Sequence, residues 1–221
     1  MFTSYDFCAG MDISHDQGNL LNRLNPGQDN LTFVFIKASG GHTIQDRNFN
    51  ANWRLAQEKG LLRGPYHFFY TGDTAAQQME NFTSMIKTLE SNDLPPVLDI
   101  EERSFDTENS VVGFQRQILE LLERMQAHFN RTPIIYTNLD VGRRYLDAEQ
   151  FANYPLWIAD PRTRSFPPVP PAWSHTGWKF WQYGTRNIAG IRTDVDYFPG
   201  TRSELIEFIA NSYTRRPDFV V

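Results

Sequence analysis

The chain has 221 residues, of which 40% are hydrophobic and 14% aromatic, enough for the core of one large domain or two small ones. Its formal net charge of −5 argues against nucleic acid as a partner, because a surface that binds phosphates is basic. No run of 18 apolar residues predicts a membrane span, and residues 1–10 lack the basic and apolar regions of a signal peptide. The single cysteine, Cys8, excludes an internal disulfide.

Strand-like and helix-like segments alternate along the chain. The continuous apolar run at 33–36 is typical of a strand buried on both faces. Apolar side chains at helical spacing predict helices, whereas residues 162–173, with four prolines, predict a loop. The predicted strands are 11–13, 33–36, 65–69, 97–100, 133–136, 156–159, 180–183 and 194–197, and the predicted helices are 48–59, 74–89, 110–129 and 203–209.

This alternation predicts an α/β fold with parallel strand pairing and right-handed crossovers. Eight strands in a chain of this length favour a single TIM-like β/α barrel, with outer helices reduced or missing in the second half. We expect one catalytic barrel domain at about 8–213 within 1–221, followed by a loose tail at 214–221. An open doubly wound sheet is the alternative, but no GxGxxG or P-loop accompanies the strands.

Carboxylates gather at the ends of the predicted strands. In the stretch "PPVLDIEER", Asp99 and Glu101 lie two residues apart, so they point to the same face of the strand. Asp12 lies in the first predicted strand, and Asp194 and Asp196 lie in the last, which neighbours the first in a closed barrel. Since active sites of β/α barrels lie at the carboxyl ends of the strands, these acids are expected to converge at one mouth.

Paired carboxyl groups at this spacing suit the cleavage of a glycosidic bond, in which one protonates the leaving oxygen and the other stabilises positive charge. A neighbouring carboxylate would raise the pKa of Glu101 and keep it protonated. The predicted strands also carry aromatic residues that could stack on sugars, or simply fill the core: Tyr66, Phe68, Tyr136, Trp157, Trp181 and Tyr183. A lone D-x-E is common, however, and acids at strand ends often cap helices or pair with arginine.

Other chemistries have weaker support. No H-E-x-x-H and no G-x-S-x-G occurs, and His15 and His67 are expected to be hydrogen-bonded barrel residues rather than zinc ligands. We therefore expect no metal and no organic cofactor.

Nine segments in order carry a resemblance to a known family. They are "GMDISHDQG" at 10–18, "FVFIKASGG" at 33–41, "DRNFNANW" at 46–53, "GLLRGPYHFF" at 60–69, "LPPVLDIE" at 94–101, "IIYTN" at 134–138, "YPLWIA" at 154–159, "WKFWQYG" at 178–184 and "DVDYFPGT" at 194–201. The chain resembles the glycoside hydrolase family 25 lysozymes, the Chalaropsis-type N-acetylmuramidases. The resemblance implies a β/α barrel that hydrolyses the β-1,4 bond between N-acetylmuramic acid and N-acetylglucosamine in peptidoglycan.

The resemblance also implies residue roles. Glu101 matches the family's general acid/base, Asp99 matches the partner of the substrate's acetamido group, and Asp12 matches the first-strand acid. The last-strand acid is Asp194 or Asp196, because counting from the two flanking segments gives different registers. Asn138, at the end of "IIYTN", joins the six aromatic residues as a substrate-binding candidate.

One departure from the family concerns the second strand, where a glutamate commonly follows the Thr or Ser and this chain has Gly40. A retaining mechanism through the acetamido group is the first hypothesis, and direct inversion through a bound water is the alternative. From another class, a barrel that binds peptidoglycan or chitin-like glycans without cleaving them also fits.

The expected partner is the peptidoglycan glycan strand, with neither nucleic acid nor membrane insertion, and the expected state is a monomer. Action at the bacterial wall then implies export by another route, release by lysis, or a leader absent from this sequence. Three biological roles fit the sequence: a phage endolysin, an exported effector and a wall-remodelling enzyme. The further protein partner expected for such roles is a phage, secretion-system or immunity protein.

Overall fold

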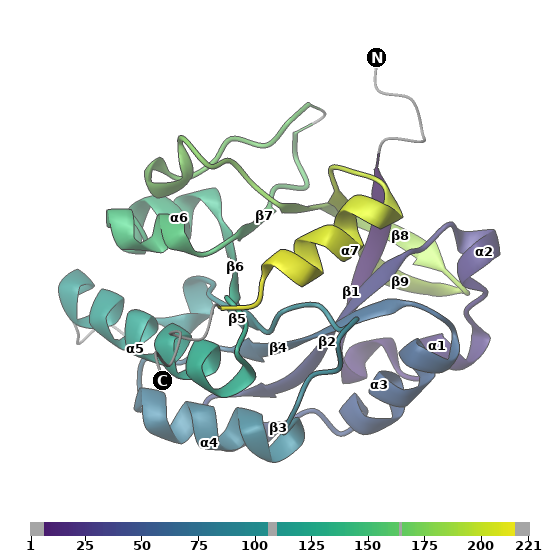
Figure 1. Cartoon of the computed structure of the whole chain (residues 1–221), viewed down its shortest axis with the longest axis horizontal. Coiled ribbons are helices and arrows are strands. Elements are labelled where there is room, and N and C mark those ends of the chain that lie inside the picture. Colours follow the sequence, from purple (N-terminus) through teal and green to yellow (C-terminus); the bar gives the residue numbers. More distant parts are fainter. Residues whose placement is uncertain (1–6, 106–109, 164, 215–221) are drawn as a thin grey trace, which may run out of the picture.

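The computed structural model describes residues 7–105, 110–163 and 165–214. Their strands form one nine-stranded sheet in the order β1-β9-β8-β7-β6-β5-β4-β2-β3, and a further pairing of β1 with β2 closes it into a barrel (Figure 1). Only the two-residue β3 lies outside the ring, paired with the end of β2. The strands are β1 Cys8–Ile13, β2 Phe33–Gly40, β3 Ile44–Gln45, β4 Leu62–Phe68, β5 Val97–Asp99, β6 Ile134–Asn138, β7 Leu156–Ala159, β8 Phe180–Ile188 and β9 Ile191–Phe198.

All eight predicted strands are present, and the expected closed barrel is confirmed. The expectation of parallel pairing throughout was wrong for β9, which runs antiparallel to both β8 and β1. The cause is the connection, because only Ala189 and Gly190 separate β8 from β9, and both have positive φ. A two-residue hairpin reverses the chain, whereas a parallel pair needs a crossover of a dozen residues or more.

Helices cover the barrel unevenly. The predicted helices are present, with α4 ending four residues earlier than expected, and α1, α2 and α6 were not foreseen. No helix connects β8 to β9, and in the described residues of the loop before β8 only the short 3-10 helix Pro171–Trp173 is present, so the expected reduction in the second half is confirmed. The helices are α1 Leu20–Arg23, α2 Pro26–Asp29, α3 Phe49–Glu58, α4 Ala75–Met85, α5 Val111–Phe129, α6 Leu139–Tyr145 and α7 Arg202–Asn211.

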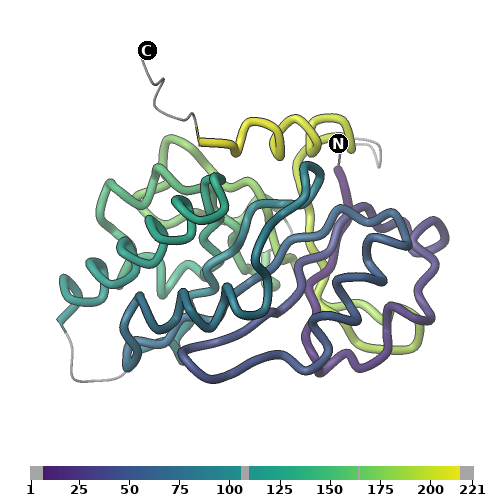
Figure 2. Tube along the Cα trace, turned by 60° about the horizontal axis from the view of Figure 1, so that its bottom comes forward, coloured from purple at the N-terminus to yellow at the C-terminus, as the bar shows by residue number. Residues whose placement is uncertain are grey.

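The tube in Figure 2 shows how the long helices lie. Helices α4 and α5 pack against each other on one side, and α7 lies at the end of the barrel where β1 begins. None of the helices in the described ranges is long and apolar enough to cross a membrane.

The floor of the barrel is an aromatic plug. Five inward side chains of four strands pack in this layer: Phe33, Phe35, Trp157, Phe180 and Phe198. Two glycines make room for it, since a Cβ at Gly10 would lie 2.3 Å from the Phe33 ring and one at Gly64 would lie 2.8 Å from the Phe35 ring. Phe208 of α7 closes the plug from below, with ring centroids 5.5 Å from Phe180.

The predicted tail at 214–221 falls almost entirely outside the described residues. Its first residue, Thr214, is held, because its N–H donates to the Asn130 carbonyl over 3.2 Å and its hydroxyl donates to Asn130 Oδ1 over 2.7 Å.

Candidate active site

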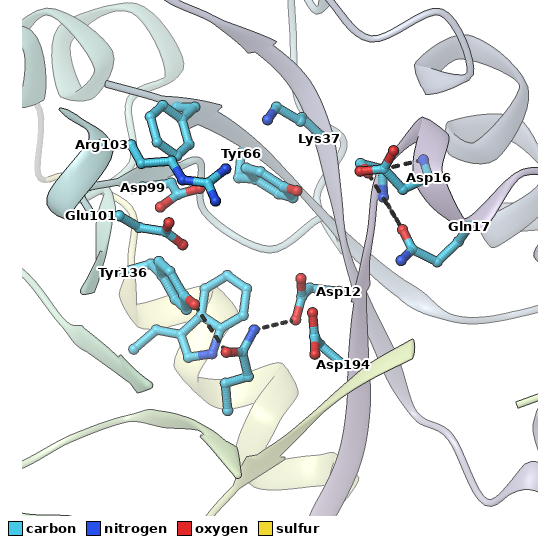
Figure 3. A pocket seen from close by; sticks show the side chains of 14 residues that line it. Asp12, Asp16, Gln17, Lys37, Tyr66, Asp99, Glu101, Arg103, Tyr136 and Asp194 are labelled. Carbon is cyan, nitrogen blue, oxygen red and sulfur yellow. Dashed lines mark hydrogen bonds between the residues drawn. The ribbon is translucent and has the colours of Figure 1, made fainter. Parts of the chain in front are cut away.

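A polar pocket of about 370 Å³ opens at the carboxyl end of the parallel strands, above the aromatic plug (Figure 3). Its walls come from β1, β2, β4, β5, β6, β7, β8 and β9, together with the segments that follow β1 and β5. The lining residues are Asp12, Ser14, Asp16, Gln17, Lys37, Tyr66, Phe68, Asp99, Glu101, Arg103, Tyr136, Trp157, Gln182 and Asp194.

Asp99 and Glu101 form one acidic wall of the pocket. Asp99 is the last residue of β5, is 7% exposed, and has an Oδ1 atom without a hydrogen-bond partner among the described residues. Burial and the charge of Glu101 hold the pKa of Asp99 well above its usual range, although Lys37 opposes this shift. Burial, and then Glu102, also raise the pKa of Glu101. Burial and the mutual repulsion of neighbouring acids both favour the protonated form of this pair.

Asp12 forms the opposite acidic wall, and its position is fixed by a chain of hydrogen bonds. Gln182 Nε2 donates to Asp12 Oδ2 over 2.7 Å, and the Tyr136 hydroxyl donates to Gln182 Oε1 over 2.9 Å (Figure 3). Burial, followed by the charge of Asp194, raises the pKa of Asp12 to about 7, and the bond from Gln182 opposes the rise. Asp12 therefore changes charge near neutral pH.

The two candidate acids of the last strand occupy different depths. Asp194 pairs with Asp12 across β1 and β9 and lines the pocket. Asp196 pairs with Gly10, is fully buried, and accepts a 2.9 Å hydrogen bond from Trp157 Nε1. Both face inward as expected, but only Asp194 lies at the mouth, whereas Asp196 lies beneath it.

Four of the seven substrate-binding candidates line the pocket, and three do not. Tyr66, Phe68, Tyr136 and Trp157 line the pocket. Trp181 and Tyr183 lie on the outer face of β8, because Gln182 between them points inward. Trp181 packs in the hydrophobic core outside the barrel. The Tyr183 ring stacks on that of Tyr197, with the ring centroids 4.0 Å apart. Asn138 caps α6 and donates to Glu102 Oε1 over 2.9 Å, outside the pocket lining.

Two cations of the pocket were missed by the sequence reasoning. Lys37 Nζ lies 5.1 Å from the Phe68 ring centroid and 5.9 Å from that of Tyr66, and Arg103 is exposed beside Glu101. Lys37 could have been found, since it is two residues beyond Phe35 and shares its inward face. Gln182 could have been found in the same way, because it is two residues beyond the inward Phe180. The other pocket residues that were missed lie in connections between strands, where side chains do not alternate: Arg103, Ser14, Asp16 and Gln17.

The two histidines are hydrogen-bonded, as expected. His67 is buried between Ser39 Oγ, at 2.8 Å from Nδ1, and Gln78 Oε1, at 3.3 Å from Nε2, and burial lowers its pKa to about 4. His15 Nδ1 lies 3.0 Å from Asp46 Oδ2. Within the described ranges, no group of three or more His, Cys, Asp or Glu side chains is arranged to hold a metal ion.

This geometry fits acid–base chemistry on a polar, uncharged ligand. Acids with raised pKa values face one another across the pocket, and aromatic rings and a lysine lie between them. Carboxyl groups that retain a proton can protonate a leaving oxygen, and ring faces can pack on sugars.

Comparisons with known proteins agree with this chemistry. The model of glycosyl hydrolases family 25 matches residues 11–191. Lysozyme M1 of Streptomyces globisporus is 29% identical over 214 residues, which cover 92% of this chain and 71% of that protein. The uncharacterized protein YegX of Escherichia coli K12 is 33% identical over 207 residues, covering 90% and 72% of the two chains.

Solved structures agree as well. The crystal structure of the bacterial lysozyme from Streptomyces coelicolor superposes with a TM-score of 0.83 at 28% identity, covering 93% of this chain and 98% of that one. The family GH25 lysozyme from Aspergillus fumigatus superposes with a TM-score of 0.81 at 29% identity, covering 92% and 99%.

Proposed function

Because the chain belongs to glycosyl hydrolase family 25, we propose that it is a muramidase that hydrolyses the β-1,4 bond between N-acetylmuramic acid and N-acetylglucosamine. The observation that carries this proposal is the convergence of Asp12, Asp99, Glu101 and Asp194 on one pocket above the barrel's aromatic plug. The named lysozymes among its relatives support the same substrate.

In the proposed first step, Glu101 donates its proton to the glycosidic oxygen as the C1–O bond breaks. Its raised pKa supports this role, because a general acid must be protonated near the working pH. The carbonyl oxygen of the muramic acid's own acetamido group attacks C1, and Asp99 orients that group from the end of β5. The electron pair of the broken bond leaves with the protonated oxygen.

In the second step, water attacks C1 while Glu101, now ionised, accepts its proton. The bond from C1 to the acetamido oxygen breaks, and Glu101 returns to its starting state. Asp12 and Asp194 face this reaction from the opposite wall, where their charge stabilises the positive charge developing on the sugar ring. Direct inversion is the alternative to both steps: a water held by one of these two acids attacks C1 as the C1–O bond to the leaving group breaks.

The aromatic and cationic groups are assigned to substrate binding. Tyr66, Phe68, Tyr136 and Trp157 supply ring faces and hydroxyls around the sugar. Lys37 lies over two of these rings and limits the negative charge of the acidic wall. The protein would then act, as a monomer, on glycan strands of the bacterial wall.

The proposal is tested by digesting purified peptidoglycan with the wild type and with Glu101→Gln, and identifying the new reducing ends by mass spectrometry. We expect muramic acid reducing ends from the wild type and a loss of about 10³-fold in rate in the variant. Glucosamine reducing ends would contradict the bond assignment. Undiminished turnover by Glu101→Gln would contradict the role of Glu101.

A further inference from the structure

A second cleft of about 470 Å³ lies at the same end of the barrel, beside the catalytic pocket. The segments that follow β2, β4 and β5 form it. Arg103, which Figure 3 shows in the catalytic pocket, also lines this cleft. The two cavities therefore meet at one guanidinium. The cleft residues are Gly40, Gly41, His42, Thr43, Ile44, Tyr70, Thr71, Gly72, Asp73, Arg103, Ser104 and Phe105.

The walls of the cleft are held from beneath by two buried amides of α4. Asn81 Nδ2 donates to the carbonyls of Gly41 and Ile44 over 2.8 and 3.0 Å. Gln78 Nε2 donates to the carbonyls of Tyr70 and Asp73 over 2.8 and 3.0 Å. Because both loops are fixed by buried side chains, the cleft is formed before any ligand arrives.

Gly40, which departs from the family pattern, and the next residue, Gly41, make room for the cleft. A Cβ at Gly40 would lie 3.2 Å from Phe68 Cβ and 3.5 Å from the Tyr70 ring. Gly41 has φ +52°, and its Cβ would lie 2.5 Å from Asp73 Oδ2. With no side chain at either position, Tyr70 packs against the end of β2, and the space above the two glycines stays open.

The side chains exposed in the cleft indicate what kind of ligand it would bind. The polar side chains of His42 and Asp73 already bind each other, with Nδ1 2.6 Å from Oδ1 and the His42 N–H donating to Oδ2 over 2.8 Å. Ile44 is exposed and apolar. Arg103 is exposed, and its positive charge lowers the pKa of the neighbouring Glu101. A ligand with small apolar groups and an anionic group fits these surroundings.

We propose that this cleft binds the peptide stem of the muramic acid residue, with a stem carboxylate on Arg103 and an alanine methyl group on Ile44. The inference rests on the proposed muramidase function, because the stem is attached to the sugar whose bond is cleaved. Arg103 marks the point where such a substituent would pass from the catalytic pocket into the cleft.

A further sugar of the glycan strand is the competing occupant. Sugars need several hydrogen-bonding side chains around their hydroxyl groups, and the amides and the acid around this cleft are already engaged with the backbone or with His42. The cleft also lies to one side, past β2 and β4, rather than across the barrel from Glu101. We therefore assign it to the peptide.

The test compares two uncross-linked glycan substrates, one with its peptide stems and one stripped of them by an amidase. Initial rates of reducing-end release are measured for the wild type, Ile44→Glu and the matched control Ile206→Glu, which adds the same charge on the exposed face of α7. Because the added carboxylate repels the stem and competes for Arg103, we expect Ile44→Glu to slow cleavage of the peptide-bearing chains about fivefold. Its rate on stripped chains should stay within about twofold of wild type, and Ile206→Glu should change neither rate.

An equal loss on both substrates would overturn the assignment in favour of a sugar, and no loss on either would remove the cleft from substrate binding. Titration of synthetic N-acetylmuramyl-pentapeptide into Glu101→Gln, with and without Ile44→Glu, measures the stem contact without turnover. Weaker binding only with Ile44→Glu supports the assignment, and equal binding overturns it. A wild type that cleaves neither glycan but binds the muramyl peptide would contradict the muramidase function while leaving the cleft's ligand in place.

Discussion

The floor and the mouth of the barrel are built by the same strands and have opposite chemistry. Along β5 the inward side chain changes from Val97 in the core to Asp99 and then Glu101 in the pocket. Along β2 it changes from Phe33 and Phe35 to Lys37. Two residues along a strand, about 6.6 Å, separate an aromatic plug from an ionisable site.

This arrangement explains the raised pKa values at the mouth. The plug excludes water from below, so Asp99 and Asp12 lose solvation on the side that faces it, and burial is the largest cause of both shifts. The floor thus supplies stability and a low-polarity surface, and the mouth supplies reactivity at some cost in stability. Substitutions should separate these two contributions.

The largest effect on stability is expected at the floor. Phe180 is fully buried against Phe33, Phe35 and Phe198, so Phe180→Ala should lower the free energy of unfolding by about 3–5 kcal/mol. Turnover per folded molecule should remain within about threefold of wild type at a temperature where the variant is folded. Denaturant unfolding measures the first quantity, and Phe166→Ala at an exposed ring is the matched control. A stable Phe180→Ala would contradict the role of the plug.

The next effect is expected at the mouth, in activity. Gln182→Leu removes the donor to Asp12 and the acceptor for Tyr136, leaving both groups without these partners. We expect the turnover rate to fall about 10–30-fold, the equivalent of one charge-assisted hydrogen bond. Gln115→Leu, which loses an exposed bond to Asp147, should keep its activity. Full activity in Gln182→Leu would show that Asp12 needs no positioning.

A smaller effect concerns stability as a function of pH. The pKa of Asp12 is about 7 in the folded protein, above its unfolded value of about 3.9, so the folded state holds the extra proton between these values. The contribution of Asp12 to the free energy of unfolding is therefore greatest below about pH 4, and it is lost as the pH rises to about 7. Asp12→Asn should be more stable than wild type by about 1–2 kcal/mol at about pH 8 and equal to it at about pH 4. Thermal unfolding at the two pH values measures the difference, and a variant that is less stable at the higher pH would contradict this account.

The smallest expected change is in the pH dependence of the rate. Asp194 is one of the charges that raise the pKa of Glu101, so Asp194→Asn should lower that pKa. The acid form of Glu101 would then be lost at lower pH, and the alkaline limb of the kcat/KM profile should move toward acid. Asp147→Asn, a substitution of an exposed aspartate outside the pocket, should leave the profile unchanged. An alkaline limb that moves the other way would contradict the assignment of Glu101 as the acid.

Much of the floor and part of the mouth could be predicted from the sequence. Apolar runs located all eight barrel strands, and alternation along them located Asp99 and Glu101. The register of the last strand could not be predicted, because Asp194 and Asp196 share a face and differ only in depth. Pairing with Asp12 and with Gly10 distinguishes them in the structure.

The sequence also could not show that two of the aromatic candidates lie outside the pocket. Trp181 and Tyr183 lie on a predicted strand, but aromatic character alone does not say which face is inward. The inward face of β8 is identified by Phe180 packing on Phe33 and Phe35, a contact between residues distant in sequence. Arg103 lies in a connection, where no alternation applies.

In the proposed mechanism Glu101 protonates the leaving oxygen, so the rate of cleavage should depend on whether the leaving group needs a proton. Cleavage by the wild type and by Glu101→Gln is measured on a muropeptide glycan and on an aryl glycoside whose leaving group needs no proton. We expect a loss of about 10³-fold in the variant on the natural glycan and a loss below about tenfold on the aryl glycoside. An equal loss on both substrates would contradict a general-acid role and show that Glu101 acts in binding or in structure.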